Sequence, residues 1–366
     1  MLRFFKKKAK GSKSKSDRYF QLTIKEVRKE TEDTNTLIFE FPARPFDYKP
    51  GQFLTLILPI KGEEVRRSYS LCSSPFSQEY PAITVKRVES GVVSNYLNDH
   101  MKPGDFFDVM EPAGHFVPEL KDGQSKKYVM FAAGSGITPI VSITKSILLV
   151  EKNSKVTLVY QNRNENSIIF KKELDELKSE HPERFNQIDV LSQPGEDWNG
   201  YSGRLNRATS SDILMDIADN KISQFDYFLC GPTEFMQTVT DTLIDFEVPE
   251  KQIHKESFYS GEPKPKASEK DTPADQELSV KIHLDGEIHE VLVPSNKSIL
   301  EAALDQDIDM PFSCQSGLCT ACRGKLLSGK VTMDEDDGLS EEELNEGYIL
   351  NCVSKPIGEG VEIEVG

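Results

Sequence analysis

The 366-residue sequence predicts a multidomain protein with an antiparallel β-barrel, an α/β domain built on a parallel sheet, and a small α+β domain. Three observations support this fold class. First, a chain of this length exceeds the roughly 250 to 300 residues at which single domains stop growing. Second, its composition of 37% hydrophobic and 28% charged residues is typical of globular proteins. Third, the pattern of apolar runs changes twice along the chain.

Residues 19–123 contain short apolar runs that are typical of β-strands, such as FLTLILPI and AITVKRV. Turn sequences with Pro-Gly pairs, YKPGQ and MKPGD, separate several of these runs. Short strands between frequent turns are characteristic of antiparallel barrels. We therefore predict a β-barrel over residues 19–123.

Residues 124–259 alternate between buried strands and helices. The apolar segments KYVMFAA, KVTLVYQ and FDYFLC read as strands, and IFKKELDELKSEH and TEFMQTVTDTLIDF read as helical stretches between or after them. Strands that alternate with helices indicate a parallel sheet, because each crossover needs a helix to return the chain. This segment is predicted to be an α/β domain.

Residues 260–275 are rich in Pro, Lys, Ser and Glu and offer almost nothing apolar to bury, so they are predicted to form a linker. Residues 276–366 follow it with LSVKIHLDGEIHEVLVP, which predicts a hairpin around Asp285 and Gly286. The segment SILEAALDQ then predicts a short helix before a cysteine-rich loop. The third domain is therefore predicted to be α+β.

Charge is unevenly distributed along the chain. The net charge is −16, and residues 275–366 carry −14 of it, whereas residues 1–18 are strongly basic and are predicted to form a disordered leader. No apolar run is long enough to cross a membrane or to act as a signal peptide. These features favour a cytoplasmic protein and predict no nucleic-acid partner. Three apolar residues beside the leader's lysines leave membrane-surface contact as an alternative: Leu2, Phe4 and Phe5.

Four of the six cysteines gather near the carboxyl end. Cys314, Cys319 and Cys322 are spaced C-x4-C-x2-C, and Cys352 follows in YILNC. Four thiolates can hold a 2Fe-2S cluster or a zinc ion, but zinc sites usually pair two C-x2-C knuckles. The segment PFSCQSGLCTACRGKLLSGKV resembles a plant-type ferredoxin with a β-grasp fold. That resemblance implies a 2Fe-2S cluster with the four cysteines as its ligands.

Two motifs in the barrel segment point to a flavin. The strand-like RRSYSL contains Arg67, Ser68, Tyr69 and Ser70, which offer a cation, hydroxyls and an aromatic ring to one ligand. The later ESGVVSNYL begins a short helix whose free N–H groups suit a pyrophosphate. Its residues at that helix start are Gly91, Val92, Val93 and Ser94.

Together these two motifs resemble the flavin domain of the ferredoxin-NADP reductase family. The resemblance implies bound FAD, with Arg67 on a phosphate, Tyr69 against the isoalloxazine ring and Ser70 donating a hydrogen bond near its N5 atom. FMN is the alternative flavin, although the turn at Gly91 favours a pyrophosphate and thus FAD.

The segment AAGSGITP resembles the nicotinamide-nucleotide turn of the same family. It follows a strand and precedes a helix, as a phosphate-binding turn should. Pro139 stands where the common dinucleotide fingerprint has its third glycine. The turn residues predicted to contact the nucleotide are Gly134, Ser135, Gly136 and Thr138.

Three further predictions follow from the same resemblance. The segment LCGP places Cys230, with Gly231 and Pro232, beside the nicotinamide. In IHKESFY, Phe258 matches an aromatic residue near the flavin, and Glu256 lies two residues before it. Ser70, Tyr69, Cys230 and Glu256 are the predicted catalytic residues.

The nucleotide preference rests on one cation. Arg163 follows VTLVYQN, where dehydrogenases that select NADH often carry an acidic residue. A cation at this position can bind a 2′-phosphate, so NADPH is the predicted substrate and NADH the alternative.

The domain order predicts an electron-transferring enzyme. NAD(P)H supplies two electrons together, a flavin can release them singly, and a 2Fe-2S cluster carries one at a time. The whole chain from residue 20 resembles the reductase components of oxygenases, most closely those of ring-1,2-phenylacetyl-CoA epoxidase and 3-ketosteroid 9α-hydroxylase. The implied partner is a terminal oxygenase or another electron-acceptor protein. Two alternatives are a membrane-bound hydroxylase or desaturase as the partner, and a redox-sensing iron-sulfur protein without turnover.

Overall fold

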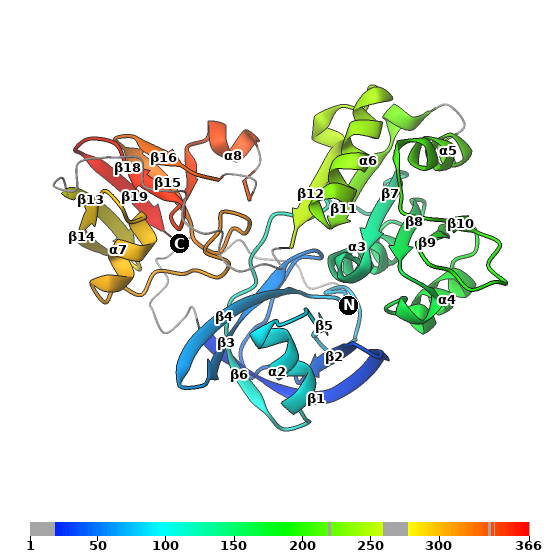
Figure 1. The fold of residues 1–366 in the computed structure, drawn as a ribbon, viewed down its shortest axis with the longest axis horizontal. Coiled ribbons are helices and arrows are strands. Elements are labelled where there is room, and N and C mark those ends of the chain that lie inside the picture. The colour runs from blue at the N-terminus through cyan, green and yellow to red at the C-terminus, as the bar shows by residue number, and fades with distance from the viewer. Residues whose placement is uncertain (1–18, 219–220, 259–276, 336–337, 340, 366) are drawn as a thin grey trace. The chain divides into compact units, whose positions relative to one another are not determined.

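The computed structural model describes residues 19–218, 221–258, 277–335, 338–339 and 341–365 (Figure 1). The predicted leader over residues 1–18 and the predicted linker over residues 260–275 lie outside these residues. Among the described residues two compact units are present, one within residues 21–258 and one within residues 277–365. The first unit contains the barrel and the α/β domain, and the second contains the cysteine-rich domain.

The first six strands form an antiparallel sheet in the order β4-β3-β6-β1-β2-β5. Its two edges meet through a bridge between Leu71 and Ile83, which closes the sheet into a barrel. The predicted antiparallel β-barrel is confirmed. Its elements are β1 (Tyr19–Thr31), β2 (Thr34–Phe39), β3 (Phe53–Ile60), β4 (Glu63–Ser70), β5 (Ala82–Lys86), α2 (Val92–His100) and β6 (Phe106–Met110).

The α/β domain has a parallel sheet in the order β10-β9-β8-β7-β11-β12. Its strands are β7 (Lys127–Ala133), β8 (Lys155–Asn162), β9 (Phe185–Leu191), β10 (Tyr201–Ser202), β11 (Asp226–Gly231) and β12 (Ile253–Ser257). Its helices are α3 (Ile137–Val150), α4 (Lys171–Glu180), α5 (Arg207–Ala218) and α6 (Thr233–Asp245), with short 3-10 turns at Gly134–Gly136, Glu165–Ser167, Ile222–Gln224 and Glu250–Gln252.

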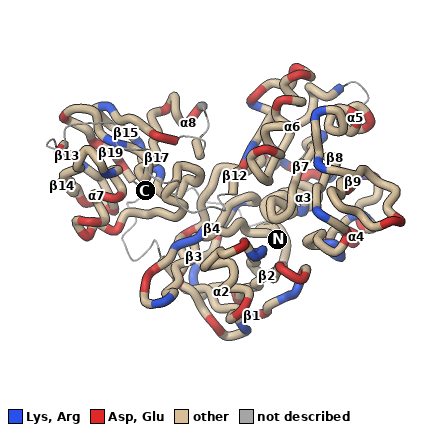
Figure 2. The backbone as a smooth tube through the Cα atoms, viewed as in Figure 1, with Lys and Arg blue, Asp and Glu red and all other residues tan. Residues whose placement is uncertain are grey.

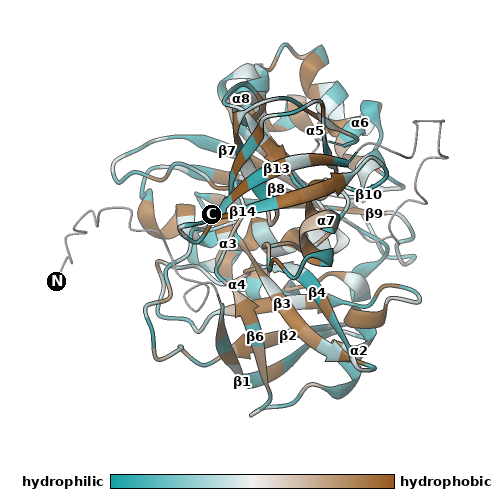
Figure 3. Cartoon of the chain, turned by 90° about the vertical axis from the view of Figure 1, so that its left-hand side faces the viewer, coloured by the Kyte–Doolittle hydropathy of each residue, from teal (hydrophilic) through white to brown (hydrophobic). Residues whose placement is uncertain are grey.

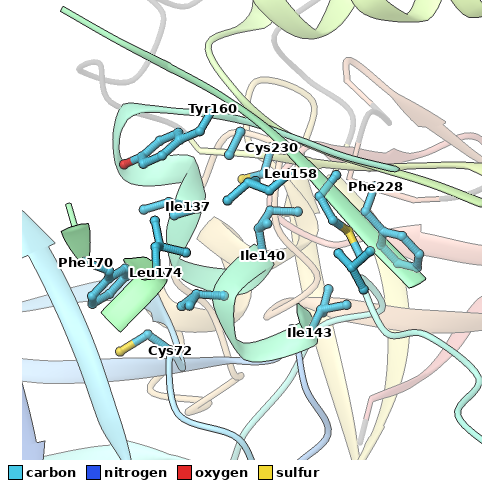
Figure 4. Close-up of a cluster of buried hydrophobic side chains, with 14 of the residues drawn as sticks. Cys72, Ile137, Ile140, Ile143, Leu158, Tyr160, Phe170, Leu174, Phe228 and Cys230 are labelled. Carbon is cyan, nitrogen blue, oxygen red and sulfur yellow. The ribbon is translucent and has the colours of Figure 1, made fainter. Parts of the chain in front are cut away.

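Helices cover both faces of this parallel sheet. Along β7, Met130 and Ala132 belong to one apolar cluster, and Val129, Phe131 and Ala133 belong to another. The alternation of side chains along a strand explains why its sequence is an unbroken apolar run. The first cluster contains side chains of α3 and α4, and the second contains side chains of α5 and α6. Figure 4 shows part of the first cluster.

The second unit has a mixed five-stranded sheet in the order β14-β13-β19-β15-β17 and a small β16-β18 pair. Its strands are β13 (Glu277–Leu284), β14 (Glu287–Pro294), β15 (Arg323–Ser328), β16 (Val331–Met333), β17 (Tyr348–Leu350), β18 (Ser354–Pro356) and β19 (Val361–Val365), and its helices are α7 (Ile299–Asp305) and α8 (Glu341–Asn345). The predicted hairpin is confirmed, with left-handed φ values of 55° at Asp285 and 84° at Gly286. Ser298 caps α7 by accepting a 3.2 Å hydrogen bond from the Glu301 backbone N–H.

Hydrophobic residues follow the strands, and hydrophilic residues predominate in the connecting loops (Figure 3). Within the described ranges, no helix combines the length and the apolar character that a membrane span requires.

Candidate functional site

The flavin motif occupies the end of β4. This strand pairs with β3, so that Ser70 lies opposite Phe53 and Tyr69 lies opposite Leu54. Because side chains alternate along a strand, Arg67 and Tyr69 share one face and Ser70 lies on the other. Arg67 is exposed, whereas burial raises the pKa of the Tyr69 hydroxyl. The strand therefore offers a cation and an aromatic ring together, as a flavin and its phosphates require.

On its own face, Ser70 meets a carboxylate of the α/β domain. The Ser70 hydroxyl donates a hydrogen bond of 3.4 Å to Oε2 of Glu256 in β12. Protein closely surrounds this partly exposed carboxyl group, and the resulting desolvation raises its pKa to about 8. Glu256 lies opposite Cys230 of the neighbouring strand β11. Three of the four predicted catalytic residues, Ser70, Cys230 and Glu256, are thus brought together from the two domains.

Cys230 lies in the apolar core beside this pair. Its side chain is 0% exposed and belongs to the cluster that covers one face of the sheet, and Figure 4 shows it near Leu158 and Ile137. Burial is the main cause that raises the pKa of its thiol well above the ordinary value. The thiol therefore stays protonated at neutral pH and packs as a small hydrophobic group. Phe258, 37% exposed, follows β12 by one residue.

The second flavin motif forms the start of a helix, as predicted. Gly91 is the N-cap of α2, and the first helical hydrogen bond runs from Asn95 N to Gly91 O. The N–H groups of Val92, Val93 and Ser94 precede that bond and have no partner within the helix. A Cβ atom at Gly91 would lie 2.7 Å from Ser94 Oγ and 2.9 Å from Val88 Cβ, so a side chain there would crowd both residues. These features suit an anionic pyrophosphate.

The nucleotide turn lies between β7 and α3. A Cβ atom at Gly136 would lie 2.1 Å from the carbonyl oxygen of Cys230, so glycine allows the turn to pack against β11. The Tyr160 hydroxyl donates a 2.9 Å hydrogen bond to the carbonyl oxygen of Gly134, whose φ is +54°. Thr138, predicted to contact the nucleotide, is buried and donates to the Ser135 carbonyl at 3.1 Å. In the structure its hydroxyl stabilises the turn.

The remaining predicted nucleotide residues also lie at the carboxyl edge of the sheet. Pro232 is the N-cap of α6, directly after Gly231 ends β11. Arg163 is exposed one residue beyond β8. All of these positions follow strand ends, which is where parallel sheets bind their ligands.

The four carboxy-terminal cysteines come together in the second unit. The thiols of Cys319 and Cys352 hydrogen-bond to Cys314 and lower its pKa, and the same contacts raise the pKa of Cys319 and Cys352. Cys352 also contacts Cys322, and the Ser316 N–H donates to the Cys314 sulfur at 3.4 Å.

This thiol group suits a cluster better than a single ion. Zinc sites usually pair two C-x2-C knuckles, whereas these cysteines follow a C-x4-C-x2-C spacing with a distant fourth thiol at Cys352. A 2Fe-2S cluster instead spreads four thiolates over two irons. The donor set therefore favours the predicted cluster over the zinc alternative.

One element near the thiols was not predicted. The short helix α8 is tied to the cysteine loop by Arg323, whose guanidinium hydrogen-bonds Glu343 and lies 4.4 Å above the Tyr348 ring. The acidic sequence of α8 shows no apolar periodicity, which is why this helix was not predicted. The chain just before α8 also contacts the cysteine loop, because the Gly338 backbone N–H donates a 2.9 Å hydrogen bond to the Gly317 carbonyl oxygen.

Comparisons with known proteins identify all three domains. An oxidoreductase FAD-binding domain matches residues 21–117, an oxidoreductase NAD-binding domain matches residues 130–241, and a 2Fe-2S iron-sulfur cluster binding domain matches residues 282–356. The predicted fold class and the predicted FAD, pyridine nucleotide and 2Fe-2S cofactors are confirmed.

Relatives match along nearly the whole chain. The ferredoxin reductase component of 3-ketosteroid-9-alpha-monooxygenase from Mycobacterium tuberculosis is 38% identical, over 96% of this chain and 98% of the relative. A component of 1,2-phenylacetyl-CoA epoxidase from Escherichia coli is 33% identical, over 94% and 97%. Among solved structures, phthalate dioxygenase reductase is 25% identical with a TM-score of 0.58, over 96% and 98% of the two chains. The chain therefore belongs to the family of oxygenase reductase components that use FAD, a pyridine nucleotide and a 2Fe-2S cluster in three successive domains.

Proposed function

We propose that this reductase transfers electrons from NADPH to the oxygenase component of a monooxygenase of the 1,2-phenylacetyl-CoA epoxidase type. The supporting observation is the match to a component of that enzyme over 94% of this chain and 97% of the relative. Electrons would then pass from the nucleotide site to the flavin site and on to the cluster site at the four cysteines.

The protein's part is to hold and orient the cofactors. When bound, a flavin would supply a hydride acceptor that can release single electrons, and a 2Fe-2S cluster would supply a one-electron carrier. The turn at Gly134–Gly136 positions the nucleotide, and Tyr69 supports the flavin ring. Ser70 and a protonated Glu256 supply hydrogen bonds at the reacting face. The four cysteines, Cys314, Cys319, Cys322 and Cys352, hold the cluster.

We propose NADPH as the substrate because two exposed arginines lie at the carboxyl edge of the parallel sheet, where such sheets bind their ligands. Leu191 of β9 lies opposite both Asn162 of β8 and Ser202 of β10. Arg163 comes just after β8 and Arg204 just after β10, so both arginines lie at the carboxyl edge of the sheet. Both are exposed, and neither forms an ion pair with another described residue. Together they suit a 2′-phosphate.

The acceptor is proposed to dock through an acidic surface of the second unit. Figure 2 shows acidic residues along α7 and α8, and Glu342 and Glu346 are exposed around α8. Opposite charge on a partner would speed the encounter and select its orientation. Such a partner would carry a basic docking patch.

A second candidate acceptor is the oxygenase component of a 3-ketosteroid-9-alpha-monooxygenase. The reductase component of that system is 38% identical to this chain, against 33% for the epoxidase component. We place the protein in the cytoplasm, because none of its six cysteines, all of which lie in the described residues, forms a disulfide bond, and cysteines without disulfides are typical of reducing compartments.

The proposal is tested by reconstitution with each purified oxygenase component. We expect NADPH-dependent epoxidation of phenylacetyl-CoA with the epoxidase components, at a rate well above that with the steroid oxygenase. Steady reduction of cytochrome c by NADPH, without either partner, separates a reductase from a sensor that does not turn over. Product formation only with the steroid oxygenase would replace the first candidate by the second.

A further inference from the structure

Helix α3 connects the nucleotide turn to the flavin strand. Its first residue follows the turn at Gly134–Gly136, and its middle turns contact the barrel loop that continues β4. The Ser142 hydroxyl donates a 2.6 Å hydrogen bond to the Ser73 carbonyl oxygen. Ser146 shares a 2.8 Å hydrogen bond with the Ser74 hydroxyl. Ser73 lies only three residues beyond Ser70. These two hydrogen bonds therefore connect the helix that follows the nucleotide turn to the chain just after the flavin strand.

Lys145 lies on the same face of α3 as Ser142 and Ser146, because residues three and four apart share a helix face. Its ammonium group lies 2.9 Å from Oε2 of Glu79, in the barrel loop, and 2.8 Å from Oε1 of Glu173, in α4. Its side chain is only 11% exposed. One largely buried cation thus bridges carboxylates from the two domains.

The surrounding contacts extend this bridge on both sides. Glu79 also accepts a hydrogen bond from the Ser74 backbone N–H. Arg28 of β1 lies 3.7 Å from Oε2 of Glu173, which adds a second cation from the barrel. Burial lowers the pKa of Lys145, but Glu173 and Glu79 more than offset this effect, and the pKa is raised overall. Lys145 therefore remains charged across the neutral range.

Apolar packing does not fix this part of the domain contact by itself. Cys72, Ala82 and Phe116 of the barrel half belong to the cluster that covers α3. Figure 4 shows Cys72 below Leu174, at the edge of that cluster. Beside Lys145 there is instead a cavity of about 220 Å³, whose other lining residues include Cys72 and Tyr80. At this point the polar contacts of Lys145 add to the apolar packing that holds α3 against the barrel.

We propose that Lys145 is a positioning residue for hydride transfer, which fixes α3 and the nucleotide turn relative to the flavin strand through its bridges to Glu79 and Glu173. Hydride transfer needs the reacting atoms about 3 to 3.5 Å apart, and a displacement of about 1 Å can slow a reaction about 100-fold. Lys145 belongs to neither the flavin motifs nor the nucleotide turn. The proposal rests on the flavin and nucleotide sites described above.

The test compares Lys145→Met, which keeps the length of the side chain but removes its charge, with Lys152→Met at an exposed position just after α3. Each holoenzyme is mixed rapidly with NADPH without oxygen, and the loss of oxidised-flavin absorbance is followed at increasing NADPH concentrations. For Lys145→Met we expect a limiting rate lowered about tenfold or more, with an unchanged NADPH dissociation constant. The long-wavelength absorbance of the nucleotide–flavin complex should weaken in parallel. Lys152→Met should behave as the native enzyme.

A second set of variants keeps the proposal testable if Lys145→Met does not fold. Glu79→Gln and Glu173→Gln each remove one bridge, and the double variant Lys145→Met with Glu79→Gln should lose less than the sum of the two single effects. Thermal unfolding of each variant reports its folding separately. A folded Lys145→Met or Glu79→Gln enzyme with the native limiting rate would overturn the proposal, as would a loss confined to nucleotide affinity. If the native enzyme reduced its flavin with neither NADPH nor NADH, the reductase function would fail instead.

Discussion

The Ser70 hydroxyl lies 3.4 Å from the Glu256 carboxylate across the junction of the barrel and the α/β domain, although 186 residues separate them in the chain. This contact places a serine of the flavin strand against an acid of the nucleotide sheet. Its chemistry depends on the protonation of Glu256.

The first prediction concerns the pH dependence of flavin reduction. Desolvation raises the pKa of Glu256 to about 8, so the carboxyl group is neutral at pH 7 and charged above pH 8. A negative charge beside the flavin opposes the arrival of hydride. We expect the limiting rate of flavin reduction by NADPH to fall as pH rises through 8, and Glu256→Gln to flatten that profile. A native profile that is flat from pH 6 to about 10 would contradict this role.

The same group makes stability depend on pH. The folded pKa of about 8 exceeds the ordinary value of 4.5, so between these values the folded protein binds more protons than the unfolded chain. The stabilising effect of Glu256 is fully present below pH 4.5 and is lost as pH rises to about 8. Thermal unfolding should show a steeper decline over this window in the native protein than in Glu256→Gln. Parallel curves for the two proteins would contradict the raised pKa.

The second prediction concerns the thiol group. Cys319→Ser should remove the cluster, because a hydroxyl oxygen is a poor substitute for a thiolate as an iron ligand. The variant should lack iron, acid-labile sulfide and the paramagnetic signal after dithionite, while its flavin is still reduced by NADPH. Cys72→Ser, which changes a buried cysteine of the barrel, is the control and should keep the cluster. Full iron and sulfide in Cys319→Ser would remove that residue from the ligand set.

The third prediction concerns nucleotide choice. Arg163→Gln and Arg204→Gln should each lower kcat/KM for NADPH by about tenfold or more, since a hydrogen bond to a charged group contributes about 1.5 to 3 kcal/mol. The value for NADH should change little, because NADH lacks the 2′-phosphate. The control is Lys152→Gln, which removes a positive charge at an exposed position. Equal losses with NADH and NADPH would assign the arginines to adenine packing.

The fourth prediction concerns docking to the acceptor. Reduction of the oxygenase by this protein should slow about tenfold between low and moderate ionic strength, because salt screens the attraction between charged surfaces. Neutralising Glu342 and Glu346 together should reduce the low-salt rate and the salt dependence. The same change at two exposed acids of the α/β domain, Glu180 and Glu183, provides the control. A rate that does not respond to salt would exclude electrostatic steering.

The fifth prediction concerns the stability of the α/β domain. Glu151 is 0% exposed and ends α3. Its carboxylate accepts hydrogen bonds from Lys121 N, Gln124 Nε2, Tyr128 Oη and Ser154 Oγ, at 3.1, 2.8, 3.0 and 2.7 Å. Glu151→Ala should destabilise the protein by about 3 kcal/mol, because several buried donors would lose their acceptor. Urea unfolding measures this loss, and Glu183→Ala should leave the midpoint unchanged.

Local features of the sequence determined much of this protein. The C-x4-C-x2-C spacing, the Gly-Ser-Gly turn after an apolar strand, and the Asp285-Gly286 hairpin each depend on neighbouring residues, and each can be recognised without the rest of the chain. The hydrophobic patterns also separated a barrel from a parallel sheet. Backbone preferences and side-chain periodicity act over a few residues, so sequence alone carries them.

Only the tertiary structure decided which distant residues meet. It brought Ser70 to Glu256, used the Thr138 hydroxyl within its own turn, and buried the Cys230 side chain in the core. It also placed Lys145 between Glu79 and Glu173, which no spacing in the sequence indicated. The physical reason is that such contacts depend on how helices and strands pack against each other, and packing is a property of the whole domain pair.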